Sequence, residues 1–169
     1  MKIAIMGYSG SGKSTLAEKL GQRFGLPVLH LDSVQFEAGW KVRDPAQSIE
    51  TVRAFLAEHP DGWVIDGNYK KFELERRLEE AARIFLLLLP RLTCLARCRK
   101  RYRMWKGKTR PDVAPGCEEK MDAEFVRWIL FDGRTRAQRA RFREILRRYP
   151  EKATAVRSQK GIDRLFASI

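Results

Sequence analysis

The sequence Gly7-Tyr8-Ser9-Gly10-Ser11-Gly12-Lys13-Ser14 directly follows the apolar run Ile3-Ala4-Ile5-Met6. It fits the pattern G-x-x-x-x-G-K-[ST] at every required position. Glycines let successive backbone N–H groups turn inward around a phosphate, and a helix that begins there adds the positive end of its dipole. The pattern therefore predicts a buried strand, a phosphate-binding loop and a helix, in that order.

This loop supplies the first candidate site residues. The Lys13 amine is a point charge for the β- and γ-phosphates of a nucleotide, and Ser14 offers a hydroxyl to Mg²⁺. The alternative is a glycine-rich turn with a chance Lys-Ser pair. We expect ATP and Mg²⁺ as cofactors. The nucleotide contacts are expected at Gly7, Ser9, Gly10, Ser11, Gly12, Lys13, Ser14 and Thr15.

Outward from the loop, short apolar runs alternate with longer helical patterns. This alternation predicts an α/β fold with a parallel sheet covered on both faces. Strands are expected at 2–6, 28–31, 62–65, 84–89 and 153–156. Helices are expected at 14–24, 46–58, 72–82, 92–105, 118–131, 135–148 and 162–167. A loop over 32–45 and a polar break over 106–116 separate them.

Two aspartates each follow an expected strand. Asp66 closes Trp63-Val64-Ile65, and Asp32 closes Val28-Leu29-His30-Leu31. Ligands of open α/β sheets bind outside the carboxyl ends of the strands, so both positions suit a site. The alternative is that both are ordinary turn or cap residues.

Length and charge bound the remaining interpretations. The chain has 169 residues and a net charge of +13, which suits a single globular domain with a basic surplus. From Arg91 to Arg148 there are 18 Lys and Arg against 7 Asp and Glu, a local excess of 18 − 7 = +11. Such a block attracts an anion, unless its members are solvated helix faces.

Neither a leader nor a membrane helix is expected. The opening apolar stretch is short, and the longest apolar run, Ile84 to Leu89, is far below the roughly 20 residues that a span needs. The cysteines are Cys94, Cys98 and Cys117, and their spacing lacks the second pair that a zinc site needs. We therefore expect reduced thiols and a cytoplasmic protein.

Several longer motifs resemble a known family. These are the glycine-rich opening with Thr15, His30-Leu31-Asp32, Gly39-Trp40, Val64-Ile65-Asp66-Gly67-Asn68-Tyr69 and Gly107-Lys108-Thr109-Arg110-Pro111-Asp112. The chain resembles the small P-loop kinases of the adenylate kinase type. Within them it is most similar to the subgroup called "DNA topology modulation protein".

The resemblance implies a three-layer P-loop fold with a five-stranded parallel sheet in the order 2-3-1-4-5. In that order Asp66 stands one strand from the loop, and Asp32 stands two strands away, about 10 Å. We therefore expect Asp66 to serve the metal and Asp32 to serve the acceptor, as a candidate base. The single domain, 1–169, would carry an acceptor-side insertion at about 32–61 and a lid at about 106–116.

Arginines on both sides of a closing lid would stabilise the transferred phosphoryl group. The expected catalytic arginines are Arg97, Arg101, Arg110 and Arg134, beside Lys13 and Asp32. Further basic candidates are Arg103, Lys106, Lys108, Arg136 and Arg139. Hinges at Gly107 and Gly116, and repulsion between the lid's own charges, predict a segment that is mobile without nucleotide. The alternative for any one of these basic side chains is that it is simply exposed to solvent and has no role in the site.

The acceptor pocket has its own candidates, Phe36, Trp40, Asn68 and Tyr69, whose aromatic rings either stack on a base or pack a loop. Ser158 lies in the Arg157–Lys160 stretch, where the family type holds adenine. No catalytic role is expected for His30 or His59. Adenylate kinases carry D-G-F-P-R where this chain has Asp66-Gly67-Asn68-Tyr69-Lys70, which argues against AMP as the acceptor.

The sequence thus favours an ATP- and Mg²⁺-dependent phosphotransferase that acts on a small molecule, with a nucleoside or nucleotide as the first candidate acceptor. The alternative is a nucleic-acid-associated P-loop ATPase or regulator of DNA topology, supported by the basic block. No recognised nucleic-acid motif accompanies that block. The oligomeric state is left open.

Overall fold

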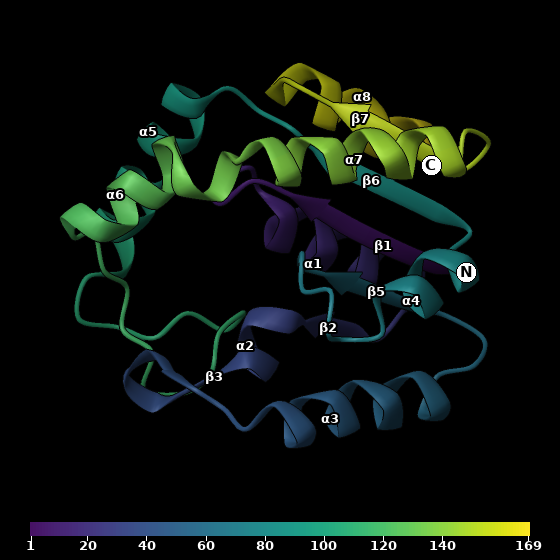
Figure 1. Cartoon of the computed structure of the whole chain (residues 1–169), viewed down its shortest axis with the longest axis horizontal. Coiled ribbons are helices and arrows are strands. Elements are labelled where there is room, and N and C mark those ends of the chain that lie inside the picture. Colours follow the sequence, from purple (N-terminus) through teal and green to yellow (C-terminus); the bar gives the residue numbers. More distant parts are fainter.

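A computed structural model describes all 169 residues, and a five-stranded parallel sheet forms its centre (Figure 1). The strands stand in the order β2-β5-β1-β6-β7. They are β1 (Lys2–Gly7), β2 (Val28–His30), β5 (Trp63–Asp66), β6 (Arg83–Leu87) and β7 (Ala153–Val156). Counting only these five along the chain, they stand second, third, first, fourth and fifth.

The central strands are buried on both faces, which explains their unbroken apolar sequences. β1 pairs with β5 on one side and with β6 on the other. A single core of 31 buried apolar residues surrounds this pairing. This core holds the strands in register. The register in turn determines where the side chains at the carboxyl ends of the strands lie.

The expected loop over 32–45 is wrong, because short regular elements fill it. The helix α2 covers Leu31–Gln35, and the strands β3 (Phe36–Glu37) and β4 (Lys41–Val42) form a separate antiparallel hairpin around the 3-10 turn η1 (Ala38–Trp40). The helix α3 (Pro45–Glu58) follows, with Asp44 accepting from the N–H groups of its first turn. Elements of two to five residues are too short to leave a periodic pattern in a sequence, so the sequence predicted no helix or strand here.

Two helical layers flank the sheet (Figure 1). In one, α4 (Leu74–Glu80) and α7 (Arg136–Arg148) are joined by ion pairs from Arg148 to Glu75 and Glu79. In the other, α1 (Lys13–Phe24) and α8 (Gln159–Ser168) are joined by a hydrogen bond from Arg23 to the Phe166 carbonyl. The α/β architecture with helices on both faces is confirmed.

The remaining helices extend beyond the sheet. They are α5 (Arg91–Trp105) and α6 (Ala123–Leu130), followed by the 3-10 turn η2 (Asp132–Arg134). The prediction that a helix begins at Glu118 is wrong. Asp122 accepts from the Phe125 N–H and caps α6, and Glu118 instead forms an isolated bridge with Thr109. The cap satisfies an N-terminal N–H that has no partner within the helix, so the helix begins there.

None of the helices combines the length and the apolarity needed to cross a bilayer. The three cysteines are buried and unbridged. Cys94 and Cys98 belong to the main core, and Cys117 belongs to a smaller cluster with Val113 and Ala114.

Candidate functional site

The glycine loop links β1 to α1 at the carboxyl edge of the sheet. Gly7, Gly10 and Gly12 have φ angles of 143°, 75° and 96°, which L side chains rarely adopt. A Cβ on Gly10 would lie 2.6 Å from both the Cys94 carbonyl oxygen and the Cys98 Sγ. The loop therefore requires glycine for its turn and for its close contact with α5.

The start of α1 has free hydrogen-bond donors. Its N-cap is Gly12, no side chain caps it, and its first turn holds no acidic residue. The first N–H groups of any helix lack partners within the helix, and the dipole there favours an anion. The loop and helix thus form a position suited to a phosphate.

Side chains of the loop differ in their partners. The Lys13 Nζ donates to the Tyr8 carbonyl oxygen at 3.2 Å. No carboxylate forms an ion pair with it. The Ser11 Oγ is buried and has no hydrogen-bond partner. Ser9 accepts from the Trp128 Nε1 at 3.1 Å, while Thr15 is exposed. Lys13 thus has no acidic partner, and the Ser11 hydroxyl is enclosed without a hydrogen-bond partner.

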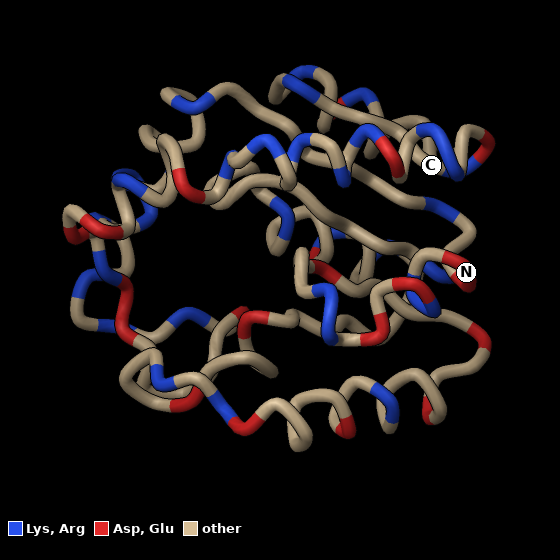
Figure 2. The backbone as a smooth tube through the Cα atoms, in the orientation of Figure 1, with Lys and Arg blue, Asp and Glu red and all other residues tan.

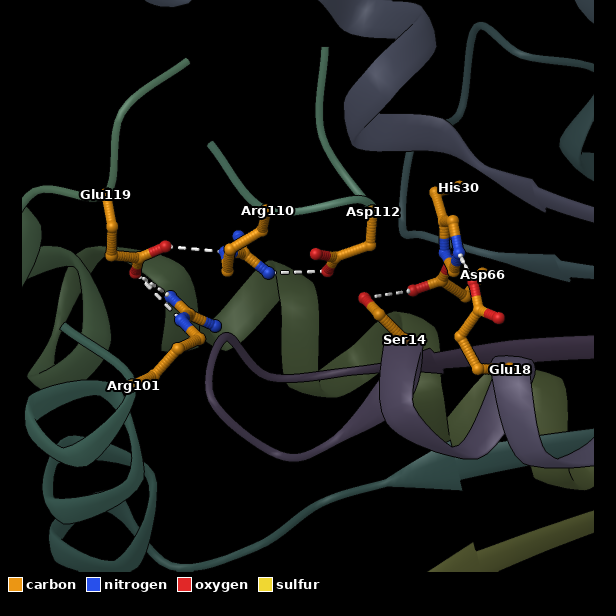
Figure 3. Close-up of polar contacts among 8 residues, drawn as sticks. All are labelled: Ser14, Glu18, His30, Asp66, Arg101, Arg110, Asp112 and Glu119. Carbon is orange, nitrogen blue, oxygen red and sulfur yellow. Dashed lines mark hydrogen bonds and ion pairs between the residues drawn. The ribbon is translucent and has the colours of Figure 1, made fainter. Parts of the chain in front are cut away.

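Asp66 lies beside this loop, on the neighbouring strand (Figure 3). The Ser14 Oγ donates to the Asp66 Oδ2 at 2.9 Å. The strand register sets this contact, because β5 pairs directly with β1 and Asp66 is opposite Ile5. The two residues that the sequence assigned to a metal are therefore brought together.

His30 holds the other oxygen of Asp66. Its Nδ1 lies 2.5 Å from the Asp66 Oδ1, and its Nε2 lies 2.7 Å from the Glu18 Oε1. Burial lowers the pKa of His30, but the hydrogen bond and charge of Asp66, with help from Glu18, raise it to about 9. The ring is therefore an imidazolium that donates to both carboxylates and fixes the orientation of Asp66.

No three His, Cys, Asp or Glu side chains are arranged to hold a metal ion by themselves. Mg²⁺ does not require such a cage, since it commonly binds through one or two protein groups with phosphate oxygens and water. The Ser14 hydroxyl and the Asp66 carboxylate fit that kind of site, because both are hard oxygen donors next to the glycine loop.

Asp32 lies farther along the same sheet edge. Asp32 follows β2, and β5 lies between β2 and β1. Asp32 is therefore two strands from the glycine loop, as expected. The Tyr69 hydroxyl donates to the Asp32 Oδ1 at 2.7 Å, and burial with the charge of Asp32 raises the pKa of Tyr69. Tyr69 therefore remains a neutral donor, and leaves the second oxygen of Asp32 without a partner among the side chains.

Asn68 joins this edge to the glycine loop. Its Oδ1 accepts from the Gly7 N–H at 3.0 Å and its Nδ2 donates to the Gly7 carbonyl at 2.7 Å. A side-chain amide that mimics a strand neighbour in this way fixes the start of the loop. Asn68 thus positions the loop, a different role from the acceptor contact that the sequence suggested.

The two aromatic candidates of the insertion pack against the expected lid. Phe36 and Trp40 meet edge to face at 5.3 Å and contact the cluster of Val113, Ala114 and Cys117. The Trp40 Nε1 donates to the Glu118 carbonyl at 2.7 Å. Of the two roles considered, loop packing is the one observed.

The segment 106–116, whose mobility without nucleotide stays a prediction, contacts the insertion. Besides the apolar cluster, the Gly39 N–H donates to the Gly116 carbonyl, which ties the segment to η1. A cleft of about 480 Å³ lies where they meet, lined by Ser33, Arg43 and residues 109–111 and 113–116.

Carboxylates from the segment neutralise its arginines (Figure 3). Arg110 contacts Asp112 and Glu119, each at 2.5 Å, and Arg101 of α5 contacts Glu119 at 2.7 Å. Glu119 is nearly enclosed, with 3% of its side chain exposed. These two acids offset the charges of Arg101 and Arg110, whereas Lys106 and Lys108 have no acidic partner.

Arg97 lies between the glycine loop and α8. It donates to the Ser11 carbonyl at 2.8 Å and to the Gln159 side chain. Ser158 caps α8 by accepting from the Gly161 N–H at 3.1 Å. Arg97 and the Arg157–Lys160 stretch are thus close together.

Arg134 contacts the glycine loop through Tyr8. Its guanidinium stacks on the Tyr8 ring at 3.8 Å and donates to the carbonyls of Leu89 and Ile129. Among the other basic candidates, Arg103, Lys106 and Lys108 are exposed, and Arg136 and Arg139 line a different cleft. Arg97 and Arg134 therefore contact the glycine loop, whereas Arg101 and Arg110 share Glu119.

Sequence reasoning missed His30, Glu18, Asp112 and Glu119. A signal for His30 existed, since it ends β2 directly opposite Asp66 in the parallel register. The acids of the segment carried no such signal, because no periodic pattern of the sequence shows which arginine each of them meets.

Comparisons with known proteins support the fold alone. No family model and no curated protein matches this chain. It is similar to a solved structure of an uncharacterized protein from Eubacterium ventriosum ATCC 27560, with a TM-score of 0.51 and 16% identity. The similarity covers 100% of this chain and 98% of that chain. The kinase family resemblance stays a prediction from the motifs.

Proposed function

We propose that this protein is an ATP- and Mg²⁺-dependent phosphotransferase that acts on a small molecule. The observation that carries the proposal is the Ser14–Asp66 hydrogen bond of 2.9 Å beside the glycine loop, with Lys13 neutralised by no acid. This combination supports an anion with a divalent cation better than it supports a purely structural turn.

On the donor side, the N–H groups of the loop and of the first turn of α1 bind the phosphates. The Lys13 ammonium exchanges the Tyr8 carbonyl for phosphate oxygens, which are the stronger, charged acceptors. Ser14 and Asp66 hold Mg²⁺, which supplies neutralisation of charge on the phosphates. His30 is a positioning residue that keeps Asp66 in place.

On the acceptor side, Asp32 takes the proton of the attacking hydroxyl on its unpartnered oxygen, while Tyr69 holds the other. The cleft between the insertion and the segment 109–116, which Ser33 next to Asp32 helps to line, would give the acceptor a place. Arg43 lines that cleft, and its Nε has no hydrogen-bond partner and only a long ion pair of 4.0 Å with the Glu37 carboxylate. An acceptor with an anionic group, such as a nucleotide, fits that arrangement.

Arg101 and Arg110 would stabilise the transferred phosphoryl group once they exchange Glu119 and Asp112 for phosphate oxygens. Arg97 and the stretch after β7 would flank the nucleoside of the donor.

The test is an ADP-release screen with Mg²⁺ and ATP over nucleosides, nucleotides, sugars and small hydroxy acids, with Lys13→Ala as the matched inactive control. We expect one acceptor class to raise ADP release in the wild type and not in the variant. ADP release that ignores every acceptor and survives Lys13→Ala contradicts the proposal.

A further inference from the structure

Arg77, on α4, is the one charged residue of the molecule that is wholly enclosed, with 0% of its surface exposed. Burial lowers its pKa to about 10, while the negative charges of Asp66 and Glu73 act in the opposite direction. The side chain therefore keeps its positive charge at neutral pH. A buried charge is costly unless it is hydrogen-bonded, so the partners of this guanidinium indicate what it does.

The guanidinium directs its hydrogen bonds to the turn between β5 and α4. Its Nε donates to the Phe72 carbonyl at 2.7 Å, and its Nη2 donates to the Tyr69 carbonyl at 2.9 Å. The two carbonyls are three residues apart, and the planar fork of the guanidinium bridges them. The remaining Nη1 has no partner, and no carboxylate forms an ion pair with Arg77. Its bonds therefore fix the path of the backbone.

Other side chains give this turn little support. Glu73, at the end of the turn, has a φ of 52°, in the left-handed region that residues other than glycine rarely adopt. No side chain caps the start of α4. Arg53 pairs with the Glu73 carboxylate, but 56% of the Arg53 side chain is exposed. Arg77 thus supplies the buried side-chain bonds to the backbone of residues 69–73.

The turn matters to the site because Tyr69 lies at its start. The Tyr69 hydroxyl donates to the Asp32 Oδ1 at 2.7 Å, and the backbone carbonyl of the same residue accepts from Arg77. The connection is short. It runs from the buried guanidinium to the Tyr69 backbone, through the phenol ring, and ends at the carboxylate of Asp32.

A second arginine holds the neighbouring carbonyl. Basic residues recur along α7 (Figure 2), and Arg141 is the one of them that bonds a backbone carbonyl, that of Asn68 at 3.2 Å. Adjacent residues are thus held from different helices, Asn68 from α7 and Tyr69 from α4. The Asn68 amide bonds Gly7 of the glycine loop, whereas Tyr69 bonds Asp32. The arginine of α4 therefore belongs to the acceptor side.

We propose that Arg77 is a positioning residue, which holds the turn after β5 so that the Tyr69 hydroxyl meets Asp32. The catalytic consequence rests on the proposed function, whereas the effect on the Tyr69–Asp32 bond does not. Tyr69 occupies one oxygen of Asp32 and so leaves the other at a defined position for the hydroxyl of an acceptor. The alternative is that Arg77 only stabilises the fold. Its loss would then lower the melting temperature and leave the Tyr69 hydroxyl unchanged in the folded protein.

The experiment measures how fast the Tyr69 hydroxyl proton exchanges with water, by NMR on the full chain labelled with ¹³C at the tyrosine Cζ. Tyr69→Phe identifies the signal among those of the four tyrosines. Arg77→Met removes the donors and keeps an unbranched, adaptable side chain. Arg77→Lys keeps the charge without the planar fork, and replaces the methionine variant if that one does not fold. Leu78→Ala, at the next and also buried position of α4, is the control for lost stability.

We expect exchange to become about tenfold faster in Arg77→Met, the effect of losing one hydrogen bond of ordinary strength. Arg77→Lys should accelerate it less, and Leu78→Ala should change it by less than about twofold. The wild-type rate in folded Arg77→Met, or in Arg77→Lys where the methionine variant does not fold, would overturn the proposal. Equal acceleration in Arg77→Met and Leu78→Ala would also overturn it, because general loosening would explain both.

The catalytic consequence is tested by kcat and nucleotide affinity together. Arg77→Met should lower acceptor-dependent kcat as much as Tyr69→Phe does, about threefold, with the affinity for an ATP analogue unchanged. The double variant should lose no more than either single one, because both act through the same hydrogen bond. Losses that multiply would overturn the assignment to the acceptor side. If no acceptor raises ADP release in the wild type, the proposed function fails, and the exchange rate of the Tyr69 hydroxyl still decides whether Arg77 positions it.

Discussion

The glycine loop and the segment 106–119 both present cations to the same edge of the sheet, but they hold them differently. The Lys13 ammonium contacts only a backbone carbonyl, at 3.2 Å, whereas Arg110 contacts two carboxylates at 2.5 Å each. Lys13 can bind a phosphate without breaking an ion pair. Arg110 would first have to break its ion pairs with Asp112 and Glu119. The loop therefore presents a cation without an acidic partner, whereas two acids hold the arginine of the segment.

Lys13→Ala should have the largest effect on activity and almost none on stability. We expect phosphoryl transfer to fall about 10³-fold, the upper range for loss of one donor to a developing charge. The folded state loses only one hydrogen bond to a carbonyl. ADP release measured beside circular dichroism checks both, and full turnover in the folded variant would contradict a phosphate site at the glycine loop.

Asp32→Asn should lower turnover about 10²-fold, as expected for removal of a general base, and leave ATP affinity unchanged. Tyr69→Phe is the matched variant, because it removes the hydrogen bond to Asp32 but keeps the carboxylate. It should cost far less activity. If Asp32→Asn weakens binding of the Mg²⁺–ATP complex as much as a change at Asp66, the separation of donor and acceptor sides is wrong.

Asp66→Asn should weaken the response to Mg²⁺ by about tenfold, and excess Mg²⁺ should restore part of the activity. The variant keeps the shape of the side chain but removes its charge, which Ser14 and His30 both contact. Asp61→Asn, an exposed change close in sequence, is the control. A Mg²⁺ titration curve that is identical for wild type and Asp66→Asn would remove Asp66 from the metal site.

Glu119→Gln tests the ion pairs that hold the segment 106–119. The change leaves Arg101 and Arg110 without their shared carboxylate, and should destabilise the segment by about 1–3 kcal/mol. Hydrogen exchange over residues 106–122 should become faster. Glu118→Gln, whose side chain is exposed and unpaired, should leave exchange unchanged. Equal exchange in both variants would mean that packing alone holds the segment.

The same two regions show what the sequence can and cannot predict. The glycine loop was predictable because its geometry depends on glycines at fixed spacing between a strand and a helix, all within residues 2–24. The parallel sheet followed from apolar runs buried on both faces. The start of α6 was missed because the Asp122 cap outweighs a helical pattern that continues upstream of it.

The segment forms pairs and contacts that a count of charges along the chain does not show. Counting charge along the chain gave an excess of cations, yet Asp112 and Glu119 neutralise the two arginines nearest to them in space. Packing of Phe36 and Trp40 on Val113 likewise joins residues more than seventy positions apart. His30 was passed over for a similar reason, since its importance comes from the strand opposite.

Binding of a non-hydrolysable ATP analogue, measured by calorimetry with and without Mg²⁺, tests the proposed donor site most directly. We predict one Mg²⁺-dependent binding event in the wild type, at least tenfold weaker in Lys13→Ala and in Ser14→Ala, with circular dichroism unchanged. Equal affinity in the wild type and both variants, or binding indifferent to Mg²⁺, would contradict the assignment of the glycine loop, Ser14 and Asp66 as the donor site.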